Sequence, residues 1–298
     1  MKKIDLHMHT SCSDGVLSPK EIIDEAVKNG VETLAIADHD TLAAYSNDFL
    51  EYAQNKNINI ITAVEISTRN DKVGIHVLGY NIDIYDKKLN KKLSKLRNSR
   101  HNYLVDVAHK LNGLGYIVNL DKLSKIDTVT KAHIALDIVE NPNNASLLDK
   151  EFNHIPNKGE FIETIMNENC PGYVKKESIT PIEASDLIRN AGGKVILAHP
   201  VAYRFEDNLE ENDVLSIVEE MKADGIESNY IYIDRNNNKI DEIEKWNTFA
   251  KDNNLIITIG SDFHNDDGIH PLIGLINEKI NLNDEDVNKI INNLLKNN

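Results

Sequence analysis

Residues 1–14 read MKKIDLHMHTSCSD. From Ile4 to His9 apolar and polar residues alternate, which is the period of a β-strand, in which residues i and i+2 share one face. His7 and His9 are therefore expected on the same side of a strand, close enough for both imidazoles to bind one metal ion. Asp14 follows in a turn-rich stretch that can fold back over the strand end. Taken alone, the motif is equally compatible with two surface histidines on an edge strand.

The composition indicates a globular chain without membrane segments. Its 298 residues can form one large α/β domain or two smaller ones. No run of about 18 apolar residues occurs, and no apolar segment follows the N-terminal lysines, so neither a transmembrane helix nor a signal peptide is expected. Cys12 and Cys170 do not make a disulfide framework, which fits a cytoplasmic protein. Nothing in the sequence indicates an obligate protein partner.

The net charge of −15 argues against broad binding to a phosphate backbone, because an acidic surface repels polyanions. Clustered carboxylates can instead be neutralised by bound cations. One stretch, 87–100, is locally basic and includes Arg97 and Arg100. A solvated helix face is the simpler interpretation of this stretch. If it faced a binding site, it would offset the acidic field for an anionic substrate.

Strands and helices alternate over the first 84 residues and again after residue 178. Short apolar runs predict strands at 31–37, 59–63, 73–78, 194–198, 225–227 and 255–259. Amphipathic patterns, several with capping signals, predict helices at 19–29, 42–55, 181–190, 214–223, 241–252 and 285–295. The alternation favours a parallel sheet of the barrel kind, with polar groups at the carboxyl ends of its strands. Between about 85 and 178 the pattern is helical, which indicates an insertion.

Polar side chains recur at the ends of these strands. One buried histidine alone is more often a structural residue bonded to a backbone carbonyl, but the recurrence at successive strand ends favours a metal site. So many nitrogen and oxygen donors exceed the needs of one tetrahedral ion, and we expect two or three divalent ions that share a bridging carboxylate. The candidate ligands are His7, His9, Asp14, His39, Glu65, His76, His199, Asp262 and His264.

At these residues the chain resembles the PHP (polymerase and histidinol phosphatase) family of metal-dependent phosphoesterases. The resemblance rests on His7-x-His9 with Asp14, Asp38-His39, Glu65, His76, Ala198-His199-Pro200 and Asp262-x-His264. It implies an α/β fold, a distorted (β/α)7 barrel with a helical insertion. The barrel would comprise 1–84 and 179–298, and the insertion, 85–178, would cap the active site.

The resemblance also implies how the ligands are shared among metal ions. The first ion would be bound by His7, His9, Glu65 and Asp262. The second would be bound by Glu65, His76 and His199, which makes Glu65 the bridging carboxylate. The third would be bound by Asp14, His39 and His264. Such nitrogen and oxygen ligands are compatible with Mn, Fe or Zn.

The insertion, at Lys131-x-His133 and at 171–174, and the segment 191–193 that follows it resemble a particular subgroup of this family. Those bacterial proteins remove phosphate from nucleoside 3′,5′-bisphosphates and trim short RNA from the 5′ end. The resemblance therefore implies hydrolysis of a nucleotide or short RNA by metal-activated water. A histidinol-phosphate or other small-molecule phosphatase is the alternative enzyme, and a metal-dependent nucleotide-binding protein is the alternative without catalysis.

Further residues are candidates for catalysis and substrate binding. Asp38 or Asp40 could orient a ligand imidazole from behind. Candidates for contacts to substrate phosphate are Lys131, His133, Arg97 and Arg100. The alternative for Lys131 is a solvated helix residue, and the alternative for His133 is a structural histidine of the insertion. The subgroup usually has Arg at the position of Lys131, and lysine keeps the charge but lacks the bidentate fork. No residue is assigned as the general acid.

Overall fold

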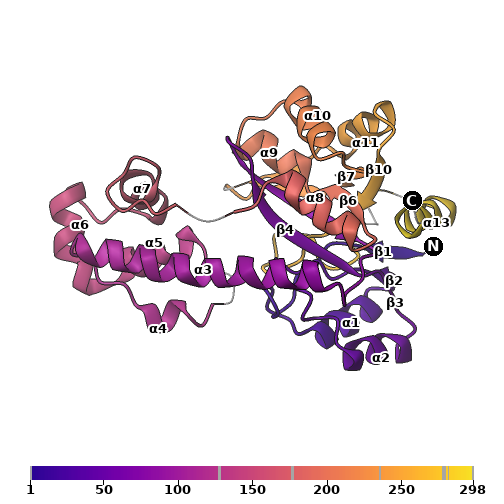
Figure 1. Ribbon diagram of the computed structural model, residues 1–298, viewed down its shortest axis with the longest axis horizontal. Helices are drawn as coiled ribbons and strands as arrows, with labels where there is room; N and C mark the ends of the chain where they lie inside the picture. Colours follow the sequence, from indigo (N-terminus) through magenta and orange to yellow (C-terminus); the bar gives the residue numbers. More distant parts are fainter. Residues whose placement is uncertain are drawn as a thin grey trace. The chain divides into compact units, whose positions relative to one another are not determined.

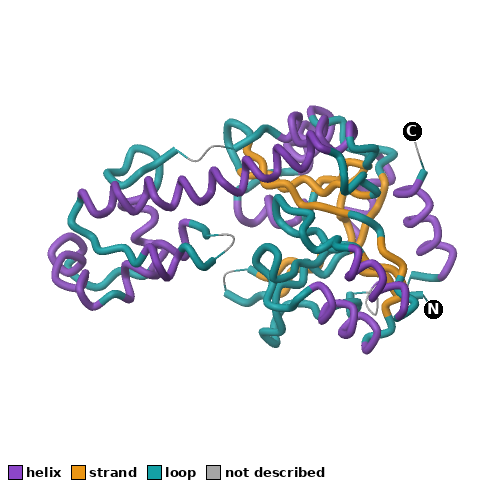
Figure 2. The backbone as a smooth tube through the Cα atoms, turned by 60° about the horizontal axis from the view of Figure 1, so that its bottom comes forward, coloured by secondary structure: helices purple, strands orange, loops and turns teal. Residues whose placement is uncertain are grey.

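The computed structural model describes residues 2–126, 129–175, 178–234, 236–276, 280 and 282–296, except for the side chains of Arg100 and His101. The chain divides into two compact units, of which the first comprises Met1–Leu93 and Ser178–Asn298 and the second Ser94–Glu177. All the strands belong to the first unit (Figure 2). No helix of the described residues is long and apolar enough to cross a membrane.

The first sheet of the first unit is built from strands β1 (Lys3–Asp5), β2 (Val31–Leu34) and β3 (Asn59–Ile60), in that order. All its pairings are parallel. The backbone after β1 stays extended, because Leu6 donates to the Ile259 carbonyl and Met8 forms a bridge with Phe263. The strand predicted around the histidine motif therefore continues past its regular part, and His7 and His9 lie on this continuation.

The second sheet has the order β10-β7-β6-β5-β4. Its strands are β4 (Ala63–Arg69), β5 (Gly74–Tyr80), β6 (Lys194–Leu197), β7 (Gly225–Asn229) and β10 (Ile256–Ile259). The pairings of β6 with β7 and of β7 with β10 are parallel, but β5 runs antiparallel to both of its neighbours. The predicted all-parallel sheet is therefore wrong at β5. The short turn 70–73 joins β4 to β5, and a parallel crossover needs a much longer connection.

The strand predicted at 59–63 is divided between the two sheets. Asn59 and Ile60 pair with β2, whereas Ala63 begins the long pairing with β5. Glu65 is therefore the third residue of β4, and the expectation that it follows a strand end is wrong. It nevertheless reaches the ends of the first sheet, because Glu65 forms a parallel bridge with His39.

Helices surround these strands in the first unit (Figure 1). They are α1 (Pro19–Lys28), α2 (Asn47–Asn55), α8 (Pro181–Asn190), α9 (Pro200–Glu206), α10 (Glu211–Glu220), α11 (Ile243–Asp252) and α13 (Asp284–Leu295). Helix α2 begins later than predicted, because the side chain of Ser46 accepts from Phe49 N and caps the helix there. A hairpin of β8 (Ile231–Ile233) and β9 (Lys239–Asp241) completes the unit.

The interior of the first unit is apolar and joins both sheets. Ile4 from the first sheet packs in one buried cluster with Tyr80, Ile196 and Ile259 from the second, and α13 adds Leu294. Burial of such side chains contributes about 1.5–3 kcal/mol each. The mixed α/β class expected from the sequence is confirmed.

The described residues of the second unit form helices joined by loops, without a strand. It contains most of α3 (Lys87–Gly113), then α4 (Leu120–Leu123), α5 (Lys131–Glu140), the 3₁₀ turn Pro142–Asn144, α6 (Ala145–Phe152), α7 (Lys158–Phe161) and the π-helical turn Ile162–Met166. This unit has a hydrophobic core of its own, in which Leu111, Tyr116, Ile134 and Phe161 are buried together.

Candidate metal centre

His7 and His9 lie side by side in the interior of the first unit. Both side chains are fully buried, and their Nε2 atoms are 3.2 Å apart. His9 donates its backbone N–H to the Phe263 carbonyl, and Asp262 donates its N–H to the His7 carbonyl. These backbone bonds hold the segment after β10 against the histidine motif and bring Asp262 to the two imidazoles.

The donor atoms around His7 and His9 have the spacing of metal ligands. Glu65 Oε2 lies 3.4 Å from His7 Nε2 and 3.3 Å from His9 Nε2. Asp262 Oδ1 lies 3.4 Å from His7 Nε2 and 3.1 Å from His9 Nε2. A tetrahedral ion with bonds of about 2.0–2.1 Å holds its ligands roughly 3.3–3.4 Å apart. The donor separations around the two imidazoles therefore fit a bound ion.

Glu65 is the carboxylate that reaches the largest number of histidines. Its Oε1 atom lies 2.9 Å from His76 Nδ1 and 3.3 Å from His199 Nε2. Its Oε2 atom lies 3.0 Å from His39 Nδ1. In the β4–β5 register His76 pairs with Ser67, two residues from Glu65, so both side chains lie on the same face. Glu65 therefore has the position that a bridging carboxylate requires.

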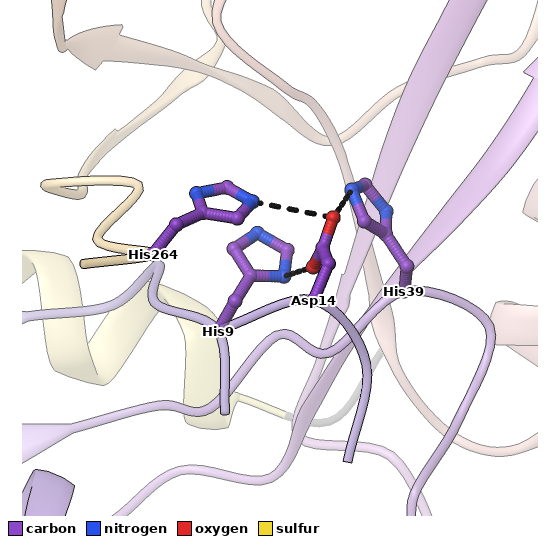
Figure 3. Close-up of side chains that lie close together, drawn as sticks. All are labelled: His9, Asp14, His39 and His264. Atoms are coloured by element: carbon purple, nitrogen blue, oxygen red, sulfur yellow. Dashed lines mark ion pairs between the residues drawn. The ribbon is translucent and has the colours of Figure 1, made fainter. Parts of the chain in front are cut away.

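A further group of donors surrounds Asp14 (Figure 3). Asp14 Oδ2 lies 3.5 Å from His264 Nε2 and 3.7 Å from His39 Nε2, and Asp14 Oδ1 lies 3.5 Å from His9 Nδ1. The three side chains that point toward Asp14 come from three separate segments of the chain. Donor atoms of all four residues lie within 4.8 Å of one another.

The structure groups the donors somewhat differently from the sets implied by the family resemblance. His9 belongs both to the group with His7 and Asp262 and to the group around Asp14. His39 likewise belongs to the Asp14 group and to a group with Glu65 and His76. The three groups thus share members and form one continuous centre.

Backbone strain marks two of these positions. His199 has φ 27° and Asp262 has φ 53°, values that residues other than glycine rarely adopt. Such conformations cost about 1–3 kcal/mol each and cluster at functional sites. The strain aims both side chains back toward the interior immediately after β6 and β10.

The electrostatics of the centre also fit cations. Burial would raise the pKa of Glu65 and Asp262, but the surrounding histidines hold the pKa of both carboxyls well below the usual range. Burial lowers the pKa of His39 well below its usual value. The buried Nδ1 atoms of His39 and His76 face Glu65, whereas Nδ1 of His199 is buried without a hydrogen-bond partner in the described structure. Ionised carboxylates beside imidazole nitrogens are the donors that divalent transition metals take.

Comparison with known proteins identifies the family. The PHP domain model matches residues 5–179. This chain belongs to the PHP domain family. The match includes the histidine motif, His39, Glu65 and His76, and it extends through the helical unit.

Curated relatives of this PHP protein cover most of its length. A 5′-3′ exoribonuclease of Haemophilus influenzae is 32% identical over 88% of this chain and 90% of its own. The 5′-3′ exoribonuclease Rnm of Escherichia coli is 31% identical over 87% of this chain and 84% of its own. A 3′,5′-nucleoside bisphosphate phosphatase of Chromobacterium violaceum is 25% identical over 89% of this chain and 88% of its own.

Solved structures support the fold. A protein of Bifidobacterium adolescentis, described as a candidate metal-dependent phosphoesterase, superposes with a TM-score of 0.71 at 20% identity and covers 99% of this chain and 97% of its own. An amidohydrolase of Chromobacterium violaceum with bound sulfate superposes with a TM-score of 0.68 at 24% identity and covers 91% and 90%. Both similarities extend over at least 91% of the PHP chain.

Asp38 and Asp40 lie beside the centre but contact backbone and hydroxyl groups. The buried Asp38 carboxylate accepts from Thr10 N at 2.7 Å, from Thr10 Oγ1 at 2.7 Å and from Ser13 Oγ at 2.6 Å. Asp38 therefore holds the loop that carries Asp14, rather than an imidazole. Asp40 Oδ1 accepts from Ser67 N at 3.1 Å, on the strand of Glu65.

The residues predicted to bind substrate belong to the helical unit. Lys131 Nζ lies 3.3 Å from Asn167 Oδ1 and 5.8 Å from the centre of the Tyr173 ring. His133 caps α5, because its Nδ1 accepts from Thr130 N at 3.1 Å. Arg97 lies on α3 with an exposed side chain, and the side chain of Arg100 lies outside the described residues.

Sequence reasoning missed polar residues that touch the ligands. Glu227 is fully buried in β7, and His7 Nδ1 donates to it. Tyr230 donates its hydroxyl to Asp262 Oδ2 at 3.2 Å, and the hydroxyl of Tyr203 accepts from His76 N at 2.9 Å. A carboxylate in the middle of an otherwise buried strand was a signal for Glu227. The two tyrosines carried none, because tyrosine is common in ordinary cores.

Proposed function

We propose that this PHP protein is a metal-dependent phosphoesterase. The observation that carries the proposal is the convergence of histidine and carboxylate donors, spaced for metal ions, in the interior of the first unit. The names of the curated relatives point in the same direction, since they describe a nuclease and a phosphatase that both hydrolyse phosphate esters. Both names concern nucleotides or RNA, and we infer that the substrate is a nucleoside 3′,5′-bisphosphate or the 5′ end of a short RNA.

We propose three divalent ions of Mn, Fe or Zn, one at each donor group. His7, His9 and Asp262 would hold the first, with Glu65 Oε2 beside it. His39, Glu65 and His76 would hold the second, with His199 close to Glu65. Asp14, His39 and His264 would hold the third. When bound, such ions lower the pKa of a water molecule and offset charge on a phosphoryl group.

The chain's own residues have distinct tasks in this proposal. The ligand side chains fix the position at which a phosphoryl group can bind. Asp38 keeps the Asp14 loop in place through Thr10 and Ser13. Lys131, His133, Arg97 and Arg100 remain our candidates for contacts to the rest of the substrate.

We also propose that the two sheets close into the seven-stranded distorted barrel of the family. Backbone contacts between the sheets support closure on both sides: Leu6 N donates to the Ile259 carbonyl, and His39 bridges to Glu65. The ring would then run through β1, β2, β4, β5, β6, β7 and β10.

The test measures phosphate release from 3′-phosphoadenosine 5′-phosphate by manganese-loaded protein. Histidinol phosphate serves as the alternative substrate, and a 5′-phosphorylated RNA of a few nucleotides tests for trimming. We expect release from the bisphosphate or stepwise shortening of the RNA, and loss of both in the His9→Ala variant.

Other outcomes would replace the proposal. Activity on histidinol phosphate alone would make the protein a small-molecule phosphatase, and the proposed metal centre would still be supported. Stoichiometric binding of the bisphosphate without turnover would favour a metal-dependent nucleotide-binding protein.

A further inference from the structure

Glu227 lies next to the metal centre without belonging to any of its donor groups. It is the third residue of β7, and its side chain has 0% exposure. A buried carboxylate is costly unless it is hydrogen-bonded or paired. The contacts of the Glu227 carboxylate therefore indicate which groups compensate for its burial.

Both carboxylate oxygens of Glu227 contact the same ring nitrogen of His7. His7 Nδ1 lies 2.9 Å from Oε1 and 3.1 Å from Oε2. Oε2 also accepts from the backbone N–H of His199 at 3.0 Å. An ionised carboxylate only accepts hydrogen bonds, so Nδ1 of His7 carries the proton. Nε2, the other ring nitrogen, faces His9, Glu65 and Asp262 and is the atom placed to bind metal.

A second observation comes from the neighbouring glycine. A Cβ atom on Gly260 would lie 2.2 Å from His7 Cβ and 2.3 Å from Glu227 Oε1. Any side chain at this position would therefore push the imidazole and the carboxylate out of place. Gly260, the residue after β10, leaves room for the His7 side chain and the Glu227 carboxylate because it has no Cβ atom. This packing requirement is independent of the hydrogen bonds.

His7 differs in this respect from the other ligand imidazoles. Nδ1 of His39 lies 3.0 Å and Nδ1 of His76 lies 2.9 Å from Glu65, and Nδ1 of His9 lies 3.5 Å from Asp14, but both of these carboxylates belong to the donor groups themselves. Nδ1 of His264 contacts the Asp262 carbonyl, and Nδ1 of His199 has no hydrogen-bond partner in the described structure. A carboxylate behind a ligand imidazole fixes its tautomer and ring orientation, and its loss typically weakens metal binding about 10–100-fold. Glu227 should therefore act selectively on the ion that His7 binds.

We propose that Glu227 is the positioning residue of this centre: it holds His7 in the Nδ1–H tautomer, so that Nε2 can bind metal. The inference rests on the metal centre of the proposed function and is independent of the substrate.

The Glu227→Gln variant tests this with minimal change in shape. The single amide oxygen can occupy the Oε2 position and accept from His199 N, where the wild-type distance is 3.0 Å. The amide NH₂ then faces His7 Nδ1 and donates to it. This inverts the tautomer and places a proton on Nε2, as happens when a buried orienting aspartate becomes asparagine in a catalytic triad.

We would measure metal content and affinity by mass spectrometry and competition with a chelating dye, and the His7 tautomer by long-range ¹H–¹⁵N NMR of the imidazoles. We expect Glu227→Gln to lose one metal equivalent, or to bind it about 10–100-fold more weakly. His7 should show the Nε2–H tautomer in the metal-free variant.

The matched control is Glu242→Gln, which removes another mostly buried carboxylate in the same unit. Glu242 pairs with Arg204 and Lys245 rather than with an imidazole. This control should keep the full metal content and the His7 tautomer of the wild type. A second comparison is the His7→Ala background, in which adding Glu227→Gln should weaken metal binding no further.

Unchanged metal content and an unchanged Nδ1–H signal in Glu227→Gln would overturn the inference. So would equal metal loss in the Glu242→Gln control, because the effect would then be one of general stability. If the wild-type protein itself bound no metal, the proposed function would fail. The two failures are therefore distinguishable.

Discussion

At the scale of single residues, His9 shows how protons and metal compete for the centre. Burial alone would lower the pKa of His9, but hydrogen bonds to Asp262 and Glu65 raise it to about 10 in the metal-free chain. His9 is then protonated near neutral pH, and an ion must displace that proton to reach Nε2. Protonated His9 stabilises the metal-free fold. This stabilisation is complete below pH 6.5, the pKa of His9 in the unfolded chain, and it is lost as the pH rises through about 10, the pKa of His9 in the folded chain.

We therefore predict that metal binding releases protons and tightens as the pH rises from 6 to 9. Calorimetric titration with Mn²⁺ in two buffers of different ionisation enthalpy measures this release directly. The observed heat should differ between the buffers at pH 7, and His9→Ala should reduce the difference. Identical heats in both buffers would contradict the prediction.

Single residues also show where sequence reasoning was strong. His7-x-His9 carries its own period, and a strand places both imidazoles on one face whatever surrounds them. Glu227 was missed because its role depends on a contact across the fold, with His7 Nδ1 2.9 Å from Oε1. No local pattern encodes such a contact. The same holds for Tyr230, whose hydroxyl reaches Asp262 from another segment.

At the scale of elements, the loop between β1 and α1 depends on Asp38. Replacing Asp38 with Ala leaves the Thr10 N–H buried without its acceptor and frees Ser13. We predict a loss of about 1–3 kcal/mol in the free energy of unfolding, together with weaker metal binding at the Asp14 group. Urea unfolding in the presence of a chelator measures the first effect, and metal titration measures the second.

Ser13→Ala is the milder companion of this variant, because it removes one of the three hydrogen bonds to Asp38. It should cost less stability and retain more of the metal affinity. If Asp38→Ala bound the full metal complement with wild-type affinity, the loop would not be needed to place Asp14.

Helix α8 permits a prediction about stability alone. The side chain of Thr180 accepts from Glu183 N, and the Glu183 side chain accepts from Thr180 N. Thr180→Ala removes this cap and should destabilise the protein by about 1 kcal/mol without changing metal content. Thr180→Asp keeps a capping oxygen and should remain near wild type. Chemical unfolding of both variants checks the expectation, and equal stability of all three proteins would contradict it.

Elements were predictable where their signals are local. The helices predicted at 19–29 and 181–190 begin at those residues in α1 and α8, because the capping residues Ser18 and Thr180 lie within one turn of the helix that they start. The direction of β5 and the division between β3 and β4 were not predicted. Both depend on which strand each segment finds as its partner, and apolar runs look alike whichever way they pair.

At the scale of the whole molecule, the metal centre links segments from both ends of the chain. His7 and His9 follow β1, whereas Asp262 and His264 follow β10, and Glu65 and His199 join them from the middle of the sequence. Without cations, the buried carboxylates of Glu65 and Glu227 and the partly buried carboxylate of Asp262 lie around a few imidazoles. Metal ions that bind only the folded chain should therefore stabilise it as a unit.

We predict that chelation lowers the thermal midpoint and that added Mn²⁺ or Zn²⁺ restores it. At a free metal concentration of 100 times Kd, one site contributes about 2.7 kcal/mol, and several sites contribute more. For 298 residues, an unfolding entropy of about 2.1 cal/mol/K per residue makes this a shift of roughly 4 °C for each site. Differential scanning calorimetry with and without chelator measures the shift. His9→Ala should respond less than the wild type, because its side chain belongs to two donor groups. A wild-type midpoint that is indifferent to chelator and to added metal would mean that these histidines and carboxylates hold the fold together without ions.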